Sequence, residues 1–231
     1  MLKAEKIVKK YTGVCGENTV LDNLDFHIEQ GQLCIITGKS GCGKSTLLNV
    51  LSCLDSFDSG YLEINGKSVS DMTSAGVCRM RRSDTAFIFQ GYNLISSMTA
   101  RENVELGLKY RHIPQKKRTQ LALAALEQVG LAHRTEHLPH QLSGGQQQRV
   151  AIARALVLKP KVLFCDEPTG NLDRDSTRLV LDKICQIKQN GACVVMITHD
   201  LSLLPLADKV YVLENGKLVS DLPTKIHKPD F

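Results

Sequence analysis

The sequence lacks any apolar run long enough to cross a membrane. Its most apolar segments, residues 162–165 and 192–198, have the length of a strand, whereas a membrane-spanning helix needs about 20 apolar residues. Residues 1–13 alternate charged and apolar side chains and contain no apolar core of a signal peptide. From these absences we expect a cytosolic chain that reaches a membrane only through a partner.

Cysteine pairs with metal-binding spacing are also missing. None of the eight cysteines forms a CxxC pair, and several lie inside apolar runs. In a chain without a secretion signal, this pattern indicates reduced thiols buried as small hydrophobic side chains, not a disulfide or zinc framework.

A strong imbalance of charge is absent too. The 29 basic and 24 acidic side chains give a formal net charge of +5, an excess too small to indicate binding to nucleic acid. There is no internal repeat and no low-complexity segment. A chain of 231 residues, 42% of them hydrophobic, suits one large α/β domain or one domain with a sizeable insertion.

Strand-length apolar segments alternate with helical patterns along the chain. Strands are expected at 19–28, 33–37, 61–66, 85–90, 161–168, 193–200, 209–216 and 217–221. The segment 33–37 suits a strand covered on both faces, whereas 19–28 alternates as in a half-exposed antiparallel sheet. Helices are expected at 44–54 and 173–188 and throughout about 99–158, where Thr99 and Glu102 form a capping box. This order predicts an α/β core with a helical insertion at about 91–159.

The segment GKSGCGKST at 38–46 fits the phosphate-binding pattern G-x-x-x-x-G-K-[ST]. It follows an expected buried strand and opens an expected helix, which is the context that this motif requires. The backbone amides of such a loop form a nest for phosphates, Lys44 is expected to reach the β- and γ-phosphates, and Ser45 is expected to ligate Mg²⁺. The predicted nucleotide-binding residues here are Gly38, Lys39, Ser40, Gly41, Cys42, Gly43, Lys44, Ser45 and Thr46.

A second motif places two acids at the end of a strand. Four apolar residues precede Asp166 and Glu167, and the carboxyl ends of strands are where open α/β sheets bind ligands. Asp166 is predicted to hold Mg²⁺ through water, and Glu167 to polarise the attacking water. Adjacent acids at such a place can also form a solvated turn, but the phosphate loop favours the catalytic interpretation.

Further motifs resemble those of the ATP-binding cassette (ABC) ATPases. LSGGQ at 142–146 matches the signature sequence of that family, Gln90 resembles its Q-loop glutamine, NLD at 171–173 its D-loop, and His199 its switch histidine. The resemblance covers about residues 3–220. It implies a P-loop NTPase fold with a mixed sheet, an antiparallel β subdomain and an α-helical insertion.

The resemblance implies a single nucleotide-binding domain over residues 1–231. An ATP-binding core with the antiparallel β subdomain would occupy 1–90 and 160–220. A helical subdomain with the signature would occupy 91–159, and residues 221–231 would form a tail.

Hydrolysis of ATP with Mg²⁺ follows from the same resemblance. Glu167, His199 and Gln90 are the predicted catalytic residues, and Ser45, Gln90 and Asp166 the predicted metal contacts. Gln90 would report the γ-phosphate to the helical insertion, and His199 would form a hydrogen bond with that phosphate.

The family architecture implies a head-to-tail dimer of two copies that encloses two ATP molecules. Each ATP would lie between the phosphate loop of one copy and the signature of the other, where a helix N-terminus favours an anion. A different ATPase subunit could replace the second copy. The remaining predicted nucleotide-binding residues are Tyr11, which would stack on adenine, and Ser143, Gly144, Gly145, Gln146 and Asp173.

Within the family, DEPTGNLD at 166–173 and the stretch 91–108 are similar to lipoprotein-release (LolD-like) and macrolide-export (MacB-like) ATPases. This similarity implies a membrane permease as partner, with four helices and a large extracytoplasmic domain, and a location on the cytoplasmic side of the inner or plasma membrane. An FtsE-like or antibiotic-sensing regulatory role without transport stays open. A soluble ABC ATPase of translation or DNA repair is disfavoured, because the chain has neither two fused cassettes nor a long coiled-coil insertion.

Overall fold

The computed structural model describes residues 1–13, 16–170 and 172–220. Cys15, Asn171 of the predicted D-loop and the predicted tail at 221–231 lie outside the described residues. In chain order the elements are β1 (Leu2–Gly13), β2 (Gly16–Ile28), β3 (Leu33–Thr37), α1 (Lys44–Leu51), β4 (Ser59–Ile64), β5 (Lys67–Ser68), α2 (Ser74–Asp84), β6 (Thr85–Ile88), α3 (Ala100–Tyr110), α4 (Gln115–Gln128), η1 (Ala132–Arg134), η2 (Pro139–Gln141), α5 (Gly144–Leu156), β7 (Val162–Asp166), α6 (Arg174–Gln189), β8 (Cys193–Ile197), η3 (Leu201–Leu206), β9 (Lys209–Glu214) and β10 (Lys217–Ser220).

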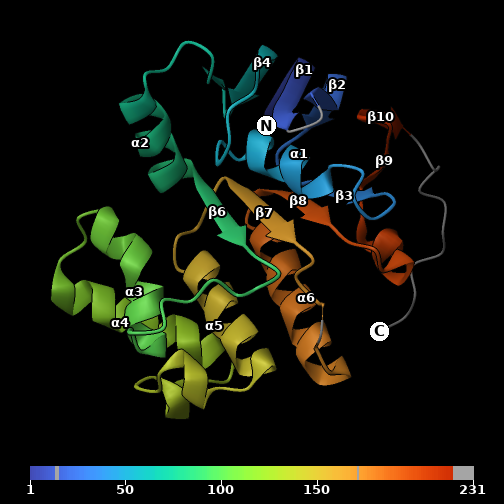
Figure 1. The fold of residues 1–231 in the computed structure, drawn as a ribbon. Coiled ribbons are helices and arrows are strands. Elements are labelled where there is room, and N and C mark those ends of the chain that lie inside the picture. Colours follow the sequence, from blue (N-terminus) through green and yellow to red (C-terminus); the bar gives the residue numbers. More distant parts are fainter. Residues whose placement is uncertain (14–15, 171, 221–231) are drawn as a thin grey trace.

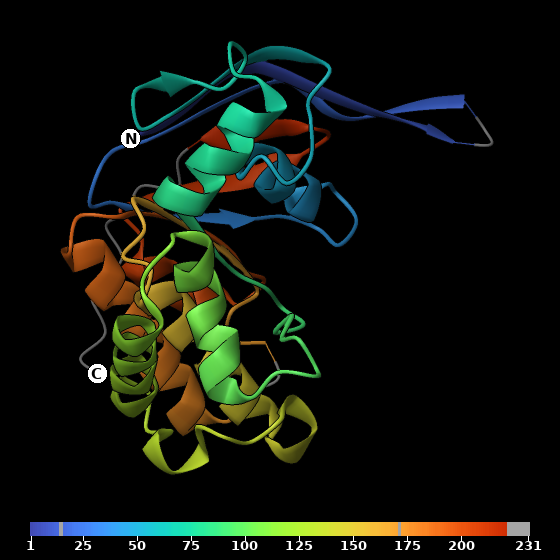
Figure 2. The same ribbon diagram turned by 90° about the vertical axis from the view of Figure 1, so that its left-hand side faces the viewer.

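Two sheets form the frame of the molecule. The larger sheet has the order β10-β9-β3-β8-β7-β6, in which only β10 is antiparallel to its neighbour. The smaller sheet, β2-β1-β4-β5, is antiparallel throughout. The distal part of the β1–β2 hairpin extends beyond the body of the fold (Figure 2). The predicted α/β fold with a mixed sheet, an antiparallel sheet and inserted helices is therefore confirmed.

The strands of the larger sheet are apolar on both faces because each face packs against another layer. Cys34 and Ile36 of β3 face a core shared with α1 and the antiparallel sheet. Leu33 and Ile35 of the same strand face a core shared with α3, α4, α5 and α6. Figure 1 shows α1 on one side of the sheet and α5 and α6 on the other. Each fully buried aliphatic side chain contributes about 1.5–3 kcal/mol, so both layers hold the strands in place.

The helices α3, α4 and α5 lie between β6 and β7 in the sequence. The predicted capping box at Thr99 and Glu102 starts α3. The prediction of helix throughout 99–158 is wrong for 111–114, where a turn separates α3 from α4. It is also wrong for 131–143, where two short 3₁₀ turns replace an α-helix. Pro139 opens the second of these turns, and its ring nitrogen cannot donate the hydrogen bond that a continuing helix needs.

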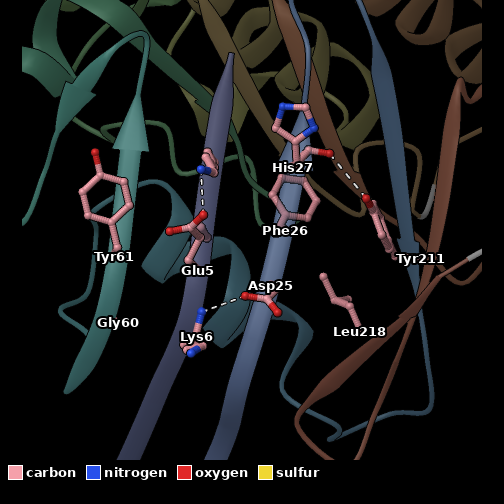
Figure 3. Close-up of a pocket in the computed structure, with 11 residues that line it drawn as sticks. Glu5, Lys6, Asp25, Phe26, His27, Gly60, Tyr61, Tyr211 and Leu218 are labelled. Carbon is pink, nitrogen blue, oxygen red and sulfur yellow. Dashed lines mark hydrogen bonds and ion pairs between the residues drawn. The ribbon is translucent and has the colours of Figure 1, made fainter.

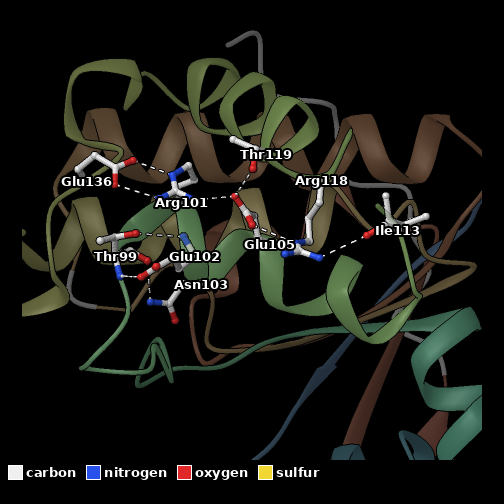
Figure 4. A network of polar contacts seen from close by, with 9 residues as sticks. All are labelled: Thr99, Arg101, Glu102, Asn103, Glu105, Ile113, Arg118, Thr119 and Glu136. Carbon is white, nitrogen blue, oxygen red and sulfur yellow. Dashed lines mark hydrogen bonds and ion pairs between the residues drawn. The ribbon is translucent and has the colours of Figure 1, made fainter. Parts of the chain in front are cut away.

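A buried carboxylate ties this helical block together (Figure 4). Glu105 of α3 accepts hydrogen bonds from Arg101, from Arg118 at 3.0 Å and from the hydroxyl of Thr119 at 2.9 Å. Arg101 also reaches Glu136 in the segment before the signature, at 2.7 Å. The network therefore joins α3, α4 and the segment 135–137, whose carbonyl oxygens also accept from the first amides of α3.

Several boundaries and one thiol differ from expectation. β6 ends at Ile88 and not at residue 90, because the chain turns so that the Tyr92 amide donates to the Phe89 carbonyl. α1 ends at Leu51 and not at residue 54. Cys34, Cys165 and Cys193 are buried as expected, whereas Cys78 on α2 is exposed, so the expectation of buried thiols is wrong there.

Within the ranges 1–13, 16–170 and 172–220, no helix combines the length and the apolar character that a membrane span requires.

Candidate nucleotide site

The carboxyl ends of the central parallel strands border a cavity of about 500 Å³. It collects predicted residues that lie up to 161 positions apart in the sequence. Its lining is Gly38, Ser40, Gly41, Gly43, Lys44, Ser45, Thr46, Gln90, Asp166, Glu167, Ile197 and His199. Most of the phosphate loop therefore faces both acids, the glutamine and the histidine across one space.

The phosphate loop depends on glycine for close approach. A Cβ atom at Gly38 would lie 2.6 Å from the Leu213 carbonyl oxygen, and one at Gly43 would lie 2.6 Å from Val20 Cγ1. The Lys44 ammonium donates to the carbonyls of Gly38 and Lys39, both at 2.9 Å. This positive charge and the free amides at the start of α1 create an environment for an anion. Lys39 and Cys42 belong to the loop but do not line the cavity.

Asp166 ends β7 inside the same cavity. Burial raises the pKa of its carboxyl, and the negative charge of Glu167 adds to this effect. A hydrogen bond with Ser45 and the charge of Lys44 oppose the rise. A cation held there would favour the ionised carboxylate. The oxygens of Ser45, Asp166 and the Gln90 amide fit a divalent cation such as Mg²⁺, which prefers oxygen ligands and retains several waters.

Glu167 and His199 form an ion pair across the cavity. Glu167 Oε2 lies 2.9 Å from His199 Nδ1 and 3.4 Å from the His199 backbone nitrogen. The hydrogen bond and the negative charge of Glu167 raise the pKa of the His199 imidazole. The carboxylate side chain is 12% exposed and the imidazole 75%. Glu167 also has a φ of +46°, in the left-handed region that few non-glycine residues adopt.

The signature segment lies outside this cavity. Ser143 caps α5, and its side chain and that of Gln146 form a reciprocal capping box. Gly144 and Gly145 follow as the first residues of the helix. Asp173 caps α6 by accepting from the Ser176 amide at 2.8 Å. Among the described residues, none of these lines the cavity that holds the phosphate loop.

Tyr11 lies on β1 near the start of α1. Its hydroxyl donates to Asp55 at 2.7 Å, and the Lys9 ammonium lies 4.9 Å from the ring centroid. The hydrogen bond to Asp55 raises the pKa of the Tyr11 hydroxyl, and one with Thr46 of the phosphate loop opposes the rise. The side chain is 42% exposed. The ring is thus beside the loop and accessible, and stacking on adenine stays a prediction.

One residue that lines the cavity and one beside it were not predicted from the sequence. Ile197 ends β8 and lines the cavity, and its carbonyl accepts from the Glu167 amide at 3.0 Å. An apolar residue at a strand end carries no functional signal. Arg154 donates to the carbonyls of Tyr92 and Asn93, next to Gln90. An arginine within a mostly buried helix is unusual, and this signal could have identified Arg154 from the sequence.

A larger cavity, of about 810 Å³, lies between the antiparallel sheet and β9–β10 (Figure 3). Polar groups in it contact one another: the Lys3 ammonium pairs with Glu5 at 2.6 Å, and Asp25 accepts from the Lys6 backbone amide at 2.8 Å. None of the predicted motif residues lines it. Size alone therefore does not identify the functional site, and the predicted motif residues line the smaller cavity.

Comparison with known proteins places these motifs in a wider group. A family model described as ABC transporter matches residues 21–170. The chain is 39% identical over 221 residues to the macrolide export ATP-binding/permease protein MacB of Vibrio parahaemolyticus. It is 42% identical over 219 residues to the ABC transporter ATP-binding protein MJ1508 of Methanocaldococcus jannaschii, covering 95% of this chain and 98% of that protein.

A solved structure shares the fold over almost the whole chain. This is the dimeric post-hydrolysis state of the ATP-binding cassette MJ0796 bound to ADP and Pi, with a TM-score of 0.92, 33% sequence identity and coverage of 98% of this chain and 100% of that one. By contrast, the match to the MacB protein of V. parahaemolyticus covers 96% of this chain but only 34% of that protein. The chain therefore spans about a third of the length of such relatives.

Proposed function

The chain belongs to the ABC transporter family and is an ATPase of that family, and from this premise we propose that it drives a membrane permease through ATP-dependent closure of a dimer. The observation that carries the proposal is that the motifs of the chain lie in two separate places. The phosphate loop, both acids, Gln90 and His199 share one cavity, while the signature lies outside it on α5.

In the proposed reaction, Lys44 and the loop amides bind the phosphates of ATP. Mg²⁺ held by Ser45, Asp166 and Gln90 would supply neutralisation of phosphate charge. Glu167 orients the attacking water and accepts its proton. Because Glu167 is paired with His199, a γ-phosphate that takes the hydrogen bond of His199 would release the carboxylate for water.

The proposed dimer follows from the absence of the signature residues from the lining of the cavity. Ser143, Gly144 and Gly145 form a helix N-terminus suited to an anion, but they do not line the chain's own cavity. A second copy placed head to tail would supply them to the open side of the site, with Gln146 and Asp173 beside them. The dimeric MJ0796 structure, described as bound to ADP and Pi, supports this arrangement.

Replacing Glu167 by glutamine tests the catalytic part of the proposal. Glu167→Gln is expected to retain ATP binding and to lower hydrolysis by roughly 10²–10⁴-fold, as loss of a positioned base does. Glu127→Gln on the exposed face of α4 is the matched control and should leave the rate unchanged. Near-normal turnover of Glu167→Gln would exclude that residue as the base.

Mixing two inactive variants tests the shared site. Ser143→Arg blocks the signature and Lys44→Ala the phosphate loop, so each homodimer is inactive. Equal mixing should restore measurable hydrolysis of at most about a quarter of the wild-type rate, because half of the dimers are mixed and each retains one of two sites. An absence of recovery at every mixing ratio would contradict the composite site.

For the permease we propose a docking groove beside the Q-loop. A cavity of about 480 Å³ lies between α2, β6, α3 and the end of α5. Its apolar wall includes Phe87 and Phe89, and Tyr110 at its rim is 59% exposed. Arg81 and Arg82 lie at the same groove. These features suit a short cytoplasmic helix of the permease with an apolar face and an acidic side chain.

The relatives support such a partner, because the MacB proteins are named as ATP-binding/permease proteins in one chain. On this proposal the present chain lies on the cytoplasmic face of the membrane, held by a permease with four helices and a large extracytoplasmic domain. We propose further that residues 91–159 form the helical unit that transmits closure, within a single nucleotide-binding domain.

Tyr110→Glu tests the groove. It should abolish stimulation of ATP hydrolysis by a reconstituted permease partner, while the rate of the isolated chain stays unchanged. Leu123→Glu, at an exposed apolar residue of α4 outside the groove, is the matched control. Equal stimulation of Tyr110→Glu and wild type would place the permease elsewhere.

A further inference from the structure

The helix that begins with the signature also contacts the catalytic segment at the end of β7. Gln148 of α5 is 1% exposed, and its Nε2 donates to the Pro168 carbonyl at 2.6 Å. Pro168 directly follows Glu167. The Gln148 Oε1 atom is buried without a hydrogen-bond partner, and such a group costs free energy unless the structure gains elsewhere. The Gln148 side chain therefore keeps its hydrogen bond to the Pro168 carbonyl although its own Oε1 atom stays without a partner.

A second contact joins the same helix to the segment after Gln90. The Arg154 guanidinium donates to the Asn93 carbonyl at 2.7 Å and to the Tyr92 carbonyl at 2.9 Å. Tyr92 and Asn93 have φ values of +60° and +48°, and each such non-glycine conformation costs on the order of 1–3 kcal/mol. A planar guanidinium with two parallel donors fits this pair of carbonyls and fixes the turn to α5.

The signature itself contacts the Gln90 segment. A Cβ atom at Gly144 would lie 2.8 Å from the Tyr92 hydroxyl, so the ring covers the start of α5. Gln148 and Arg154 are six residues apart, which is about 9 Å along a helix. One rigid helix thus contacts the Gln90 segment at both ends and the Glu167 segment between them.

We propose that Gln148 and Arg154 are positioning residues that couple the two ATP sites of the dimer. The proposal rests on the proposed dimer, in which α5 serves the nucleotide of the partner. ATP that displaces the Gln90 or Glu167 segment of one chain then displaces α5 of that chain, and with it the signature that completes the other site. Both sites therefore respond to each nucleotide, and hydrolysis depends cooperatively on ATP concentration.

The test replaces Arg154 by methionine and measures steady-state hydrolysis of the full-length chain against ATP concentration. We expect kcat to fall by about 10–100-fold, since a misplacement of about 1 Å at a reacting centre can cost about 100-fold. The Hill coefficient should fall to 1. Binding of a fluorescent ATP analogue to the monomer should change by less than about twofold, because the phosphate loop is untouched.

Arg149→Met is the matched control. Arg149 lies on the same helix, but its guanidinium reaches the Val129 carbonyl of the helical block at 3.4 Å, so both kcat and the Hill coefficient should stay at wild-type values. Arg154→Lys retains one donor and should give an intermediate kcat. Gln148→Met keeps the volume and loses the donor, so it should lower kcat and cooperativity as Arg154→Met does, and it serves if the latter does not fold.

Wild-type cooperativity in folded Arg154→Met and Gln148→Met would overturn the coupling alone. An equal loss in Arg149→Met would do the same, because it would indicate general damage to α5. An unsubstituted chain that hydrolyses ATP with a Hill coefficient of 1, and forms no ATP-dependent dimer, would overturn the proposed dimer together with the coupling.

Discussion

Glu105→Gln is expected to weaken the helical block without touching the nucleotide cavity. Glu105 is 7% exposed, and its carboxylate accepts from Arg101, Arg118 and Thr119. Glutamine has the same shape but no charge, and its amide group would face an arginine donor. Loss of one partner from a buried ion pair costs about 3–5 kcal/mol. Since Arg101 keeps Glu136 and both arginines are partly exposed, we expect a loss of about 2–3 kcal/mol in the free energy of unfolding.

For a chain of this length, that loss lowers Tm by about 4–12 °C. Urea unfolding followed by circular dichroism at pH 7 measures the free energy. Glu127→Gln, an exposed acid on α4, is the control and should differ from wild type by less than about 0.5 kcal/mol.

The pH dependence gives a sharper check on this reasoning. Burial alone raises the pKa of Glu105, but the hydrogen bonds from Arg101, Arg118 and Thr119 outweigh it and lower the pKa below the usual value. A lowered folded-state pKa contributes stability that is fully present above the unfolded pKa of about 4.3 and is lost as pH falls through the folded pKa. The difference in the free energy of unfolding between wild type and Glu105→Gln should therefore be fully present at pH 7 and at pH 5. It should shrink as the pH falls below about 4. A difference below about 0.5 kcal/mol at pH 7, or one that stays constant down to pH 3.5, would refute the account.

Three further results are expected. Gly144→Ala should change the free energy of unfolding by less than about 1 kcal/mol, because the atom that its methyl group meets is the terminal hydroxyl of Tyr92, which can shift, and because alanine favours the helix. With Tyr92→Phe added, which removes that hydroxyl, the same substitution should be more favourable in a double-mutant cycle; identical effects in the two backgrounds would count against the contact. Cys78, the exposed thiol among the described cysteines, should react first with a thiol reagent, because burial raises the pKa of the core thiols; mass spectrometry that finds a core thiol labelled as fast would contradict this packing. In Glu167→Gln, the imidazole of His199 should titrate at lower pH than in wild type by NMR, since the carboxylate that raises its pKa is gone; an unchanged midpoint would mean that the two side chains do not pair.

The sequence predicts the central strands and the cavity well because local signals mark both. An apolar run such as 33–37 has the length of a buried strand, and the glycine loop that follows fixes where the chain turns into α1. Asp166 and Glu167 follow a second apolar run. Since parallel strands end at the same edge of a sheet, motifs at their ends must meet. The cavity lining of phosphate loop, acids and His199 agrees with that expectation.

The sequence gives no comparable signal for α2. Over Ser74–Asp84 the helix buries only Met80 and Asp84, so there is no apolar stripe with helical spacing to detect. Its position comes from the Thr73 cap and from contacts with the rest of the fold. The prediction of a helix over 131–143 was wrong for the opposite reason. The helices on both sides suggested one continuous helical pattern, which Pro139 interrupts.

Contacts between distant segments were also out of reach of sequence patterns. Gln148 and Pro168 are 20 residues apart, and Arg154 and Tyr92 are 62 apart. Helical periodicity shows that α5 has a buried face, but not which loop carbonyls that face meets. Only the packing of α5 against the sheet brings these groups together.

The central position of β3 also bears on the order in which the chain can fold. β3 pairs with β8 on one side and with β9 on the other, and the Leu213 carbonyl of β9 closes against Gly38 of the phosphate loop. A ribosome synthesises about 5–20 residues per second, so the loop at 38–46 emerges well before the strand that supports it. The nascent chain therefore cannot hold a nucleotide in its final geometry until residue 213 has left the ribosome. Because this pairing spans about 175 residues, its closure should be slow and should expose the edges of β3 to chaperones in the interval.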